Sequence, residues 1–480
     1  MPSRSNSGLD SAAAHKTVTE AWAGTVLSSL SELVAIPAVS QAFDPDWAVH
    51  GELNRAIDHV RDWALSRGIP EVTAQIVVSE GAAPCLLIDV PASGDSDAGT
   101  VLLYGHLDKQ PPVGGWADGL GPWTPVVRDG RLYGRGAADD GYAPYAALTA
   151  IEAVRAGGGA HARCVVLLET AEESGSPDLP AYLDQVRSRL GAVSLVVCLD
   201  SGTNDYERLW LTTSLRGLAQ VHLTAKVLEG GQHSGIASGV VPSSFRVLRE
   251  LLDRLEDART GEVLLPEMHV EITDELLAEV RAGVEAAPGV LKHFPLTPGV
   301  RTVSDDDIEL TLNNAWRPTL SVTGAAGLPD PDSAGNVLRP FTTLCLSFRL
   351  PPTADSAKAL AAIRRAVTTD VPYGAQIELG HTEAADGWQA PPLAPWLSAA
   401  LDEASESAFG GAPWRTLGLG GSIPFMGLLQ EMYPTAQFIA TGVLGLDSNA
   451  HVPDESINLG YASKLTEALA VVLNAHANRG

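Results

Sequence analysis

The fold is decided by the stretch Val101-Leu102-Leu103-Tyr104-Gly105-His106-Leu107-Asp108. It begins as an apolar run of strand length, and an imidazole and a carboxylate follow. Two later apolar runs end in the same way: residues 164–170 lead into Glu172-Glu173, and residues 194–199 lead into Asp200. Ligands of open α/β sheets bind at the carboxyl ends of the strands. We therefore expect three buried strands to bring acidic and imidazole side chains to one edge of a sheet.

Segments with helical periodicity surround these strands. Apolar residues recur at helical spacing in residues 26–36, 47–67, 143–155 and 179–190. Between residues 126 and 134, two short runs joined by Asp129-Gly130 predict a β-hairpin. Strands that alternate with helices in this way predict an α/β fold, with a mixed sheet flanked by helices.

The pattern changes after Thr213. Residues 219–227 and 343–350 alternate as half-exposed strands, and residues 241–255 and 356–367 are amphipathic at helical spacing. Residues 262–340 are rich in Pro, Gly and Asp and receive no assignment. From residue 396 to 475, helical and strand patterns return. We expect a smaller α+β lid or dimerisation domain at 214–385, inserted into a catalytic metal-binding domain made of 1–213 and 386–480.

Composition excludes several partners. Asp and Glu number 58 against 32 Lys and Arg among 480 residues, a formal charge of −26, and no basic run offsets it. Such a chain is not expected to bind nucleic acid or an anionic membrane. The four cysteines are far apart in sequence and no C-x-x-C pair occurs, which is typical of reduced core thiols in an intracellular protein. With no apolar segment of membrane-spanning or signal length, we expect a cytoplasmic protein.

Two of the strand ends suggest a metal site. His106 and Asp108 are two residues apart, so the carboxylate can accept the proton of the ring nitrogen that does not bind metal. A hydrogen-bonded turn histidine is the alternative. Glu172 and Glu173 are adjacent carboxylates, which repel each other unless a cation or a shared proton stabilises them. A solvated loop is the alternative for this pair, and an ordinary turn residue for Asp200.

Taken together, these residues resemble the M20 family of metallopeptidases, in particular its carnosinase-like dipeptidase branch. Eight motifs match in order, over most of the chain. They are 105–108 (GHLD), 134–140 (GRGAADD), 172–176 (EESGS), Asp200, 232–235 (QHSG), 347–349 (SFR), 420–424 (GGSIP) and His451. An ordered set of this kind is far more specific than any single motif.

The resemblance implies a dinuclear metal site. Asp139 would bridge two divalent ions, His106 and Asp200 would complete one site, and Glu173 and His451 would complete the other. Two imidazoles and three carboxylates suit Zn²⁺, with Mn²⁺ or Co²⁺ as alternatives. In relatives a cis peptide follows the bridging aspartate, so the bond between Asp139 and Asp140 is predicted to be cis.

The resemblance also implies roles in catalysis. Glu172 would be the general base, and Asp108 would orient His106. Arg349 would bind a substrate carboxylate, with Gly421 and Ser422 offering contacts near it. A surface arginine and a plain glycine turn are the alternatives.

The remaining implications concern assembly and substrate. His233 would reach the active site of a partner subunit in a homodimer, although an exposed loop histidine is the alternative. The chain departs from the family where Gly141-Tyr142 follows the aspartate pair, since Lys and Gly are common there. The implied activity is hydrolysis of dipeptides or short peptides by a metal-activated water. An N-acyl-amino-acid amidohydrolase and a non-catalytic metal-binding scaffold remain alternatives.

Overall fold

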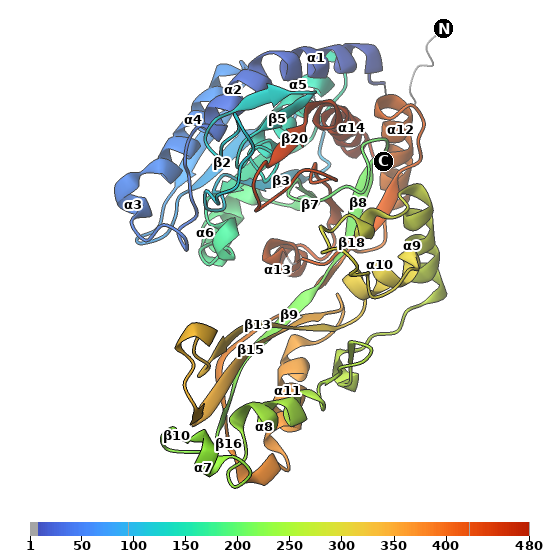
Figure 1. Cartoon of the computed structure of the whole chain (residues 1–480). Coiled ribbons are helices and arrows are strands. Elements are labelled where there is room, and N and C mark those ends of the chain that lie inside the picture. Colours follow the sequence, from blue (N-terminus) through green and yellow to red (C-terminus); the bar gives the residue numbers. More distant parts are fainter. Residues whose placement is uncertain (1–7, 95, 422, 480) are drawn as a thin grey trace. The chain divides into compact units, whose positions relative to one another are not determined.

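The computed structural model describes residues 8–94, 96–421 and 423–479. The chain divides into two compact units. The first comprises the described parts of Met1–Thr213, Ala390–Leu417 and Pro424–Gly480, and the second comprises those of Ser214–Gln389 and Gly418–Ile423 (Figure 1). The chain thus enters the second unit once from the first and returns to it for a short loop near residue 420.

The first unit contains a mixed sheet with helices on both faces, as predicted. Its strands follow the order β1 (Thr73–Val77), β2 (Cys85–Val90), β6 (Arg163–Glu169), β3 (Thr100–His106), β7 (Val193–Cys198), β19 (Gln437–Ala440) and β8 (Trp210–Leu215). The central strands β6, β3, β7 and β19 are parallel, while β1, β2 and β8 pair antiparallel with their neighbours. Strands β3, β6 and β7 are almost wholly buried, which explains their continuous apolar sequences.

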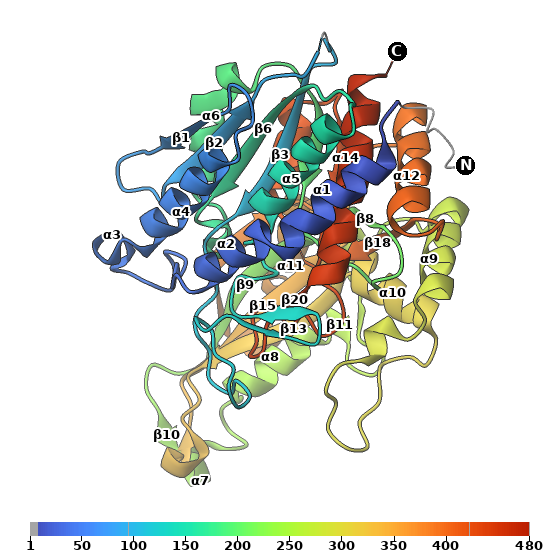
Figure 2. The ribbon, with the colours of Figure 1, turned by 90° about the horizontal axis from the view of Figure 1, so that it is seen from above.

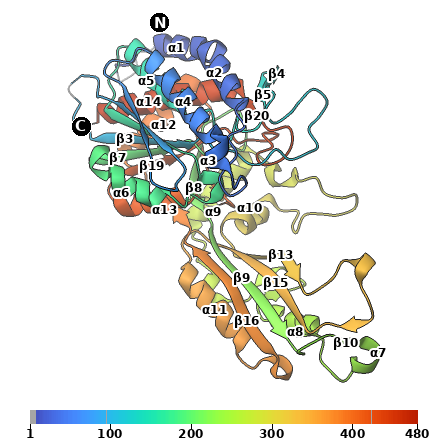
Figure 3. The ribbon, with the colours of Figure 1, turned by 90° about the vertical axis from the view of Figure 1, so that its left-hand side faces the viewer.

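Two groups of helices cover this sheet. On one face lie α1 (Ser11–Ala23), α2 (Thr25–Val34), α4 (Glu52–Ser66), α5 (Ala143–Ala156) and α14 (Leu459–Ala477), with α12 (Pro395–Ala408) against α14. Figure 2 shows α1, α5 and α14 side by side. The other face carries α6 (Leu179–Leu190) and α13 (Pro424–Met432) (Figure 3). None of the described helices is long and apolar enough to cross a membrane.

One predicted helix was wrong in its extent. The segment 47–67 forms two helices, α3 (Trp47–His50) and α4, because Gly51 between them has φ 72°, a left-handed conformation that ends α3. The predicted hairpin is confirmed as β4 (Val126–Arg128) and β5 (Arg131–Tyr133), which pairs with β20 (Ser456–Asn458). All four cysteines are free, and three are buried.

The second unit has the predicted α+β pattern. Its four-stranded antiparallel sheet has the order β13 (Thr319–Ala326), β15 (Phe341–Leu350), β9 (Gly217–Lys226) and β16 (Gln376–Ala385). Helices α8 (Ser244–Leu252) and α11 (Ser356–Thr368) pack on it, and the buried positions of β9 and β15 alternate. Shorter elements of this unit include β10 (Gln232–His233), β14 (Val337–Leu338), α7 (Ser234–Ala237) and β17 (Trp388–Gln389). Strand β18 (Arg415–Leu419) pairs with β8 and begins in the first unit.

The unassigned segment 262–340 is folded as part of this unit. It contains α9 (Asp274–Ala286), the short 3₁₀ turn η3 (Val290–Lys292) and α10 (Asp307–Ala315), before it continues into β13. Val280, Leu312, Ala315 and Trp316 form a small separate core between α9 and α10. The apolar periodicity of residues 262–340 is weak because this small core contains few apolar residues.

Candidate metal centre

The parallel strands bring the first group of ligands together. His106 ends β3 and lies opposite Glu169 of β6, while Tyr104 lies opposite Cys198 of β7. The side chains that follow these strands therefore meet at one edge of the sheet. His106 Nε2 is 3.2 Å from Asp139 Oδ1 and 3.9 Å from Asp200 Oδ2. All three residues are buried.

A second group shares Asp139 with the first. His451 Nε2 is 2.9 Å from Asp139 Oδ2 and 3.3 Å from Glu173 Oε2. Glu173 lies in the 3₁₀ turn η1 (Glu172–Ser174) after β6, and His451 lies in the loop between β19 and β20. In each group, the ligand atoms lie within 4.8 Å of one another. The two carboxylate oxygens of Asp139 thus face different histidines, which is the arrangement that a bridging ligand requires.

The donor chemistry of both groups fits a divalent cation. Carboxylates outnumber imidazoles, so the centre carries excess negative charge. Burial first, and then the negative charge of Asp139, raises the pKa of Glu173 to about 8. Burial likewise raises the pKa of Asp200 to about 6, and the hydrogen bond with Asp139 raises the pKa of His451 to about 9. Bound cations would favour the deprotonated forms of these groups. Ligand atoms about 2.0–2.2 Å from a tetrahedral Zn²⁺ lie roughly 3.3–3.6 Å apart, which is close to the distances between the side-chain atoms in each group.

Asp108 contacts both the η1 turn and His106. Its Oδ1 and Oδ2 accept the backbone N–H groups of Glu172 and Glu173 at 3.2 and 3.0 Å. His106 Nδ1 is 3.1 Å from the backbone carbonyl of Asp108 and 3.4 Å from its Oδ1. The carbonyl is the nearer acceptor because the carboxylate is turned toward the η1 turn. Either acceptor leaves His106 Nε2 free to face Asp139 and Asp200.

Glu172 lies beside these ligands, and its environment favours its protonated form. Burial, followed by the negative charge of Asp200, raises the pKa of Glu172 well above its ordinary value. Glu172 thus adds a further carboxyl group to this cluster, directly before Glu173 in the η1 turn.

The loop that carries Asp139 is held by a buried ion pair that the sequence analysis missed. Glu455 Oε2 accepts from Arg135 Nη1 at 2.7 Å, and Oε1 accepts from the backbone N–H groups of Gly136, Ala138 and Asp139 at 2.9 to 3.3 Å. Glu455 is fully buried and Arg135 is 1 % exposed. The peptide bond between Asp139 and Asp140 is cis, as predicted.

A second missed residue contacts a ligand directly. Gln110 Nε2 donates to Glu173 Oε2 at 2.6 Å. The position of Gln110, two residues after Asp108, was an available signal for it. For Glu455 the signal was an acidic residue shortly after His451, together with an arginine inside the Gly-rich motif 134–140.

The other predicted site residues belong to the second unit and are described within it. His233 is exposed at the start of α7, and its Nδ1 accepts from Gly235 N at 3.1 Å. Arg349 is half-buried on β15, opposite Thr319 of β13. The carbonyl of Gly421 accepts from Arg216 N at 3.1 Å. Ser422 lies outside the described residues.

Comparisons with known proteins identify the family of the chain. Residues 102–475 match the model of peptidase family M20/M25/M40. A cysteinylglycine-S-conjugate dipeptidase of Corynebacterium striatum is 29 % identical over 368 residues, 75 % of this chain and 78 % of its own length. The Cys-Gly metallodipeptidase DUG1 of Saccharomyces cerevisiae is 26 % identical over 76 % of both chains. The beta-Ala-His dipeptidase of Homo sapiens is 28 % identical over 56 % of this chain, and the match spans only 53 % of that relative.

A solved structure supports the fold over the full length. The crystal structure of human carnosine dipeptidase 1 aligns with a TM-score of 0.74 at 23 % sequence identity, covering 98 % of this chain and 100 % of that one. The family match covers well over half of the chain and includes the described residues of both ligand groups. The chain is therefore an enzyme that belongs to peptidase family M20/M25/M40.

Proposed function

We propose that this enzyme hydrolyses the peptide bond of dipeptides and uses two divalent metal ions to do so. The observation that carries the proposal is the pair of ligand groups that share Asp139 and lie beside Glu172. The names of the relatives, which include dipeptidases for Cys-Gly and beta-Ala-His, support dipeptides as the substrate class.

In this proposal, His106 and Asp200 hold one ion, Glu173 and His451 hold the other, and Asp139 binds both. We propose Zn²⁺ because imidazole and carboxylate ligands suit it, with Mn²⁺ or Co²⁺ as the ions to compare. Bound divalent cations would supply Lewis acidity toward the scissile carbonyl and toward a water molecule.

Glu172 acts as the general base and then as the general acid. Its carboxylate accepts a proton from the oxygen of the attacking water and then donates this proton to the nitrogen of the leaving amine. Asp108 holds the backbone N–H groups of the η1 turn, so it fixes the direction of the Glu172 side chain. No covalent intermediate with the enzyme is needed.

Substrate binding and transition-state stabilisation would involve the second unit. Arg349 binds the substrate carboxylate through its planar guanidinium group, with Gly421 and Ser422 beside it. His233 stabilises the developing oxyanion in the active site of a partner subunit, which makes the enzyme a homodimer with shared sites. Mixing inactive Glu172→Ala protein with inactive His233→Ala protein should then restore part of the activity. No recovery after verified subunit exchange would remove His233 from the proposal.

The proposal is tested by metal depletion and substrate comparison. Chelated enzyme is titrated with Zn²⁺, Mn²⁺ or Co²⁺ and assayed with Cys-Gly, beta-Ala-His and Ala-Ala. N-acetyl amino acids and N-succinyl amino acids form the second panel. Recovery with dipeptides at about two ions per chain would support the proposal. Turnover of the acylated panel alone would replace it with an amidohydrolase, and metal binding without any turnover would favour a scaffold.

A further inference from the structure

Three loops of the first unit expose large apolar side chains at or beside the Glu173 and His451 ligand group. Phe43, Val113 and Val452, one on each loop, are 37 to 49 % exposed. Single exposed apolar residues are common on protein surfaces, whereas a group of them in one place indicates a binding site. The contacts of the three loops show that these residues form such a group.

The loop before α3 is fastened to the turn that carries Glu173. Ser40 Oγ is 2.5 Å from Ser174 Oγ, and Ala42 N donates to the same oxygen at 2.9 Å. Ser174 directly follows Glu173 in η1. Phe43, the next residue after Ala42, therefore lies on a loop that is held one residue away from a proposed metal ligand.

The loop that follows β3 contacts Glu173 itself. Gln110 Nε2 donates to Glu173 Oε2 at 2.6 Å, and Val113 lies three residues further along the chain. Trp116 is half-buried, and its Nε1 donates to the carbonyl of Val113 at 2.9 Å. Because this bond satisfies the only polar atom of the Trp116 side chain, the rest of the ring offers an apolar surface.

The third loop carries His451 and is tied to the second. Arg135 Nη2 donates to the carbonyl of Val452 at 3.1 Å, and the guanidinium carbon lies 5.7 Å from the centre of the Trp116 ring. The same guanidinium donates to Glu455 at 2.7 Å through Nη1. One buried cation thus holds Val452 and Trp116 near each other, directly after a proposed metal ligand.

The apolar rim of the metal centre consists of Phe43, Val113, Trp116 and Val452. All four belong to the unit that contains both ligand groups. In a dipeptide, the scissile carbonyl belongs to the N-terminal residue, and the side chain of that residue begins two bonds from the carbonyl carbon. A carbonyl held at the ligand groups therefore brings the N-terminal side chain into the first unit.

The charge of the rim indicates what kind of side chain it accepts. All four side chains are uncharged, and Arg135, the cation near Trp116, is already paired with Glu455. A charged substrate side chain would lose hydration at the rim without gaining an ion partner. The rim therefore favours an apolar side chain.

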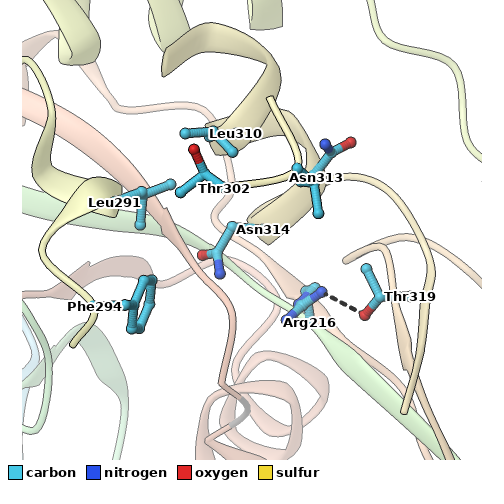
Figure 4. Close-up of a pocket in the computed structure, with 9 residues that line it drawn as sticks. Arg216, Leu291, Phe294, Thr302, Leu310, Asn313, Asn314 and Thr319 are labelled. Carbon is cyan, nitrogen blue, oxygen red and sulfur yellow. Dashed lines mark hydrogen bonds between the residues drawn. The ribbon is translucent and has the colours of Figure 1, made fainter. Parts of the chain in front are cut away.

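The second unit has an apolar surface of its own, which is separate from the rim. Leu291, Phe294 and Leu310 line a cavity of about 310 Å³, together with polar side chains such as Arg216 (Figure 4). All described residues that line this cavity belong to the second unit, which holds neither ligand group. In the unit that carries the metal ligands, the rim is thus the apolar surface next to the scissile bond.

We propose that the apolar rim contacts the N-terminal side chain of the dipeptide and makes peptides that begin with a large apolar residue the preferred substrates. The inference rests on the proposed function, because it assigns the scissile carbonyl to the metal centre. A leucine side chain at the rim leaves water, which an N-terminal glycine cannot do, so the transition state for Leu-Gly is bound more tightly than that for Gly-Gly.

The kinetic test compares Leu-Gly with Gly-Gly in metal-loaded enzyme, so that only the N-terminal side chain differs. The kcat/KM for Leu-Gly should exceed that for Gly-Gly about 10- to 100-fold, and Val452→Ser should reduce this ratio about 5- to 20-fold. Phe43→Ser should reduce it as well. Val127→Ser is the matched control and should keep the wild-type ratio, because Val127 is 52 % exposed on β4 of the same unit, outside the rim. A wild-type ratio near one, or equal ratios in Val452→Ser and Val127→Ser, would overturn the proposal.

A binding test separates this inference from the proposed function. Calorimetric titration of the Zn²⁺-loaded full chain uses leucine hydroxamate and glycine hydroxamate, which contain no peptide bond. Leucine hydroxamate should bind about tenfold more tightly, and Val452→Ser should remove most of this difference while Val127→Ser keeps it. If no dipeptide is cleaved but this pattern appears, the proposed function fails and the rim stands. Equal binding of the two hydroxamates to wild type, or binding of neither, would refute the rim.

Discussion

Replacing Glu455 with glutamine should destabilise the first unit and weaken metal binding at the same time. The carboxylate is fully buried and accepts four hydrogen bonds, one from Arg135 and three from backbone N–H groups at residues 136, 138 and 139. The amide of Glu455→Gln has a single acceptor oxygen. If that oxygen faces the backbone, an NH₂ group faces the Arg135 guanidinium, and a buried charge loses its partner.

The expected magnitude follows from this geometry. Removing one partner of a buried ion pair costs about 3–5 kcal/mol, because the other charge stays buried without compensation. That is a large part of the roughly 5–15 kcal/mol that stabilises a typical domain. Since three of the four bonds hold the segment that ends at Asp139, the Asp139 carboxylate should also move. We expect metal content below that of wild type, and activity reduced more strongly than stability alone would explain.

The assay combines urea unfolding, metal content after gel filtration, and kcat/KM for a dipeptide. Glu467→Gln is the matched control, because Glu467 is also buried in the first unit and accepts from His15 and Ser407 at 2.8 and 2.9 Å. The Glu467→Gln variant should lose about 1–2 kcal/mol of its free energy of unfolding and keep the metal content of the wild type. Glu455→Gln protein with the stability and metal content of this control would show that Glu455 does not hold the Asp139 loop in place.

Three further outcomes are expected. Glu172→Gln should keep its metal but lose turnover by a factor of about 10² or more, since only proton transfer is removed, and near-normal kcat in the metal-replete variant would contradict this. Chelation should lower the free energy of unfolding by about 2.7 kcal/mol for each ion present at a hundredfold excess over its Kd, which calorimetry checks, and an unchanged unfolding midpoint would argue against bound metal. His161 should make the protein less stable in acid. Burial, together with Arg155, which donates to its Nε2, lowers the pKa of His161 from 6.5 to about 4. Between these two pH values the unfolded chain binds a proton that the folded chain does not. The free energy of unfolding should fall by up to about 3 kcal/mol as the pH falls from 6.5 to 4. The variant His161→Gln should reduce this loss, whereas the control His293→Gln, at an exposed position, should not.

The strands and the ligands that follow them could be predicted because local sequence determines both. A buried parallel strand such as 101–106 requires a continuous apolar run, and the residue after it must lie at the sheet edge. The acidic and imidazole side chains of His106, the pair Glu172-Glu173, and Asp200 could therefore be found from three separate segments. The pairing of His451 with Asp139 had no local signal, and the family resemblance supplied it.

Other features depend on contacts that no single segment encodes. The acceptor of the His106 ring proton depends on how the Asp108 carboxylate turns toward the η1 turn, which forms over 60 residues later. The role of Glu455 depends on the Gly-rich loop more than 300 residues before it. The α3–α4 break at Gly51 was missed because apolar periodicity continues across it, while the backbone does not.

The proposed function requires two divalent ions in the ligand groups that share Asp139. The most direct measurement is an anomalous difference map from crystals of the full chain loaded with Zn²⁺, recorded above the zinc absorption edge. Two peaks per chain are expected, about 3.5–4 Å apart, one among His106, Asp139 and Asp200 and the other among Asp139, Glu173 and His451. A single peak at full occupancy, or peaks away from Asp139, would contradict it.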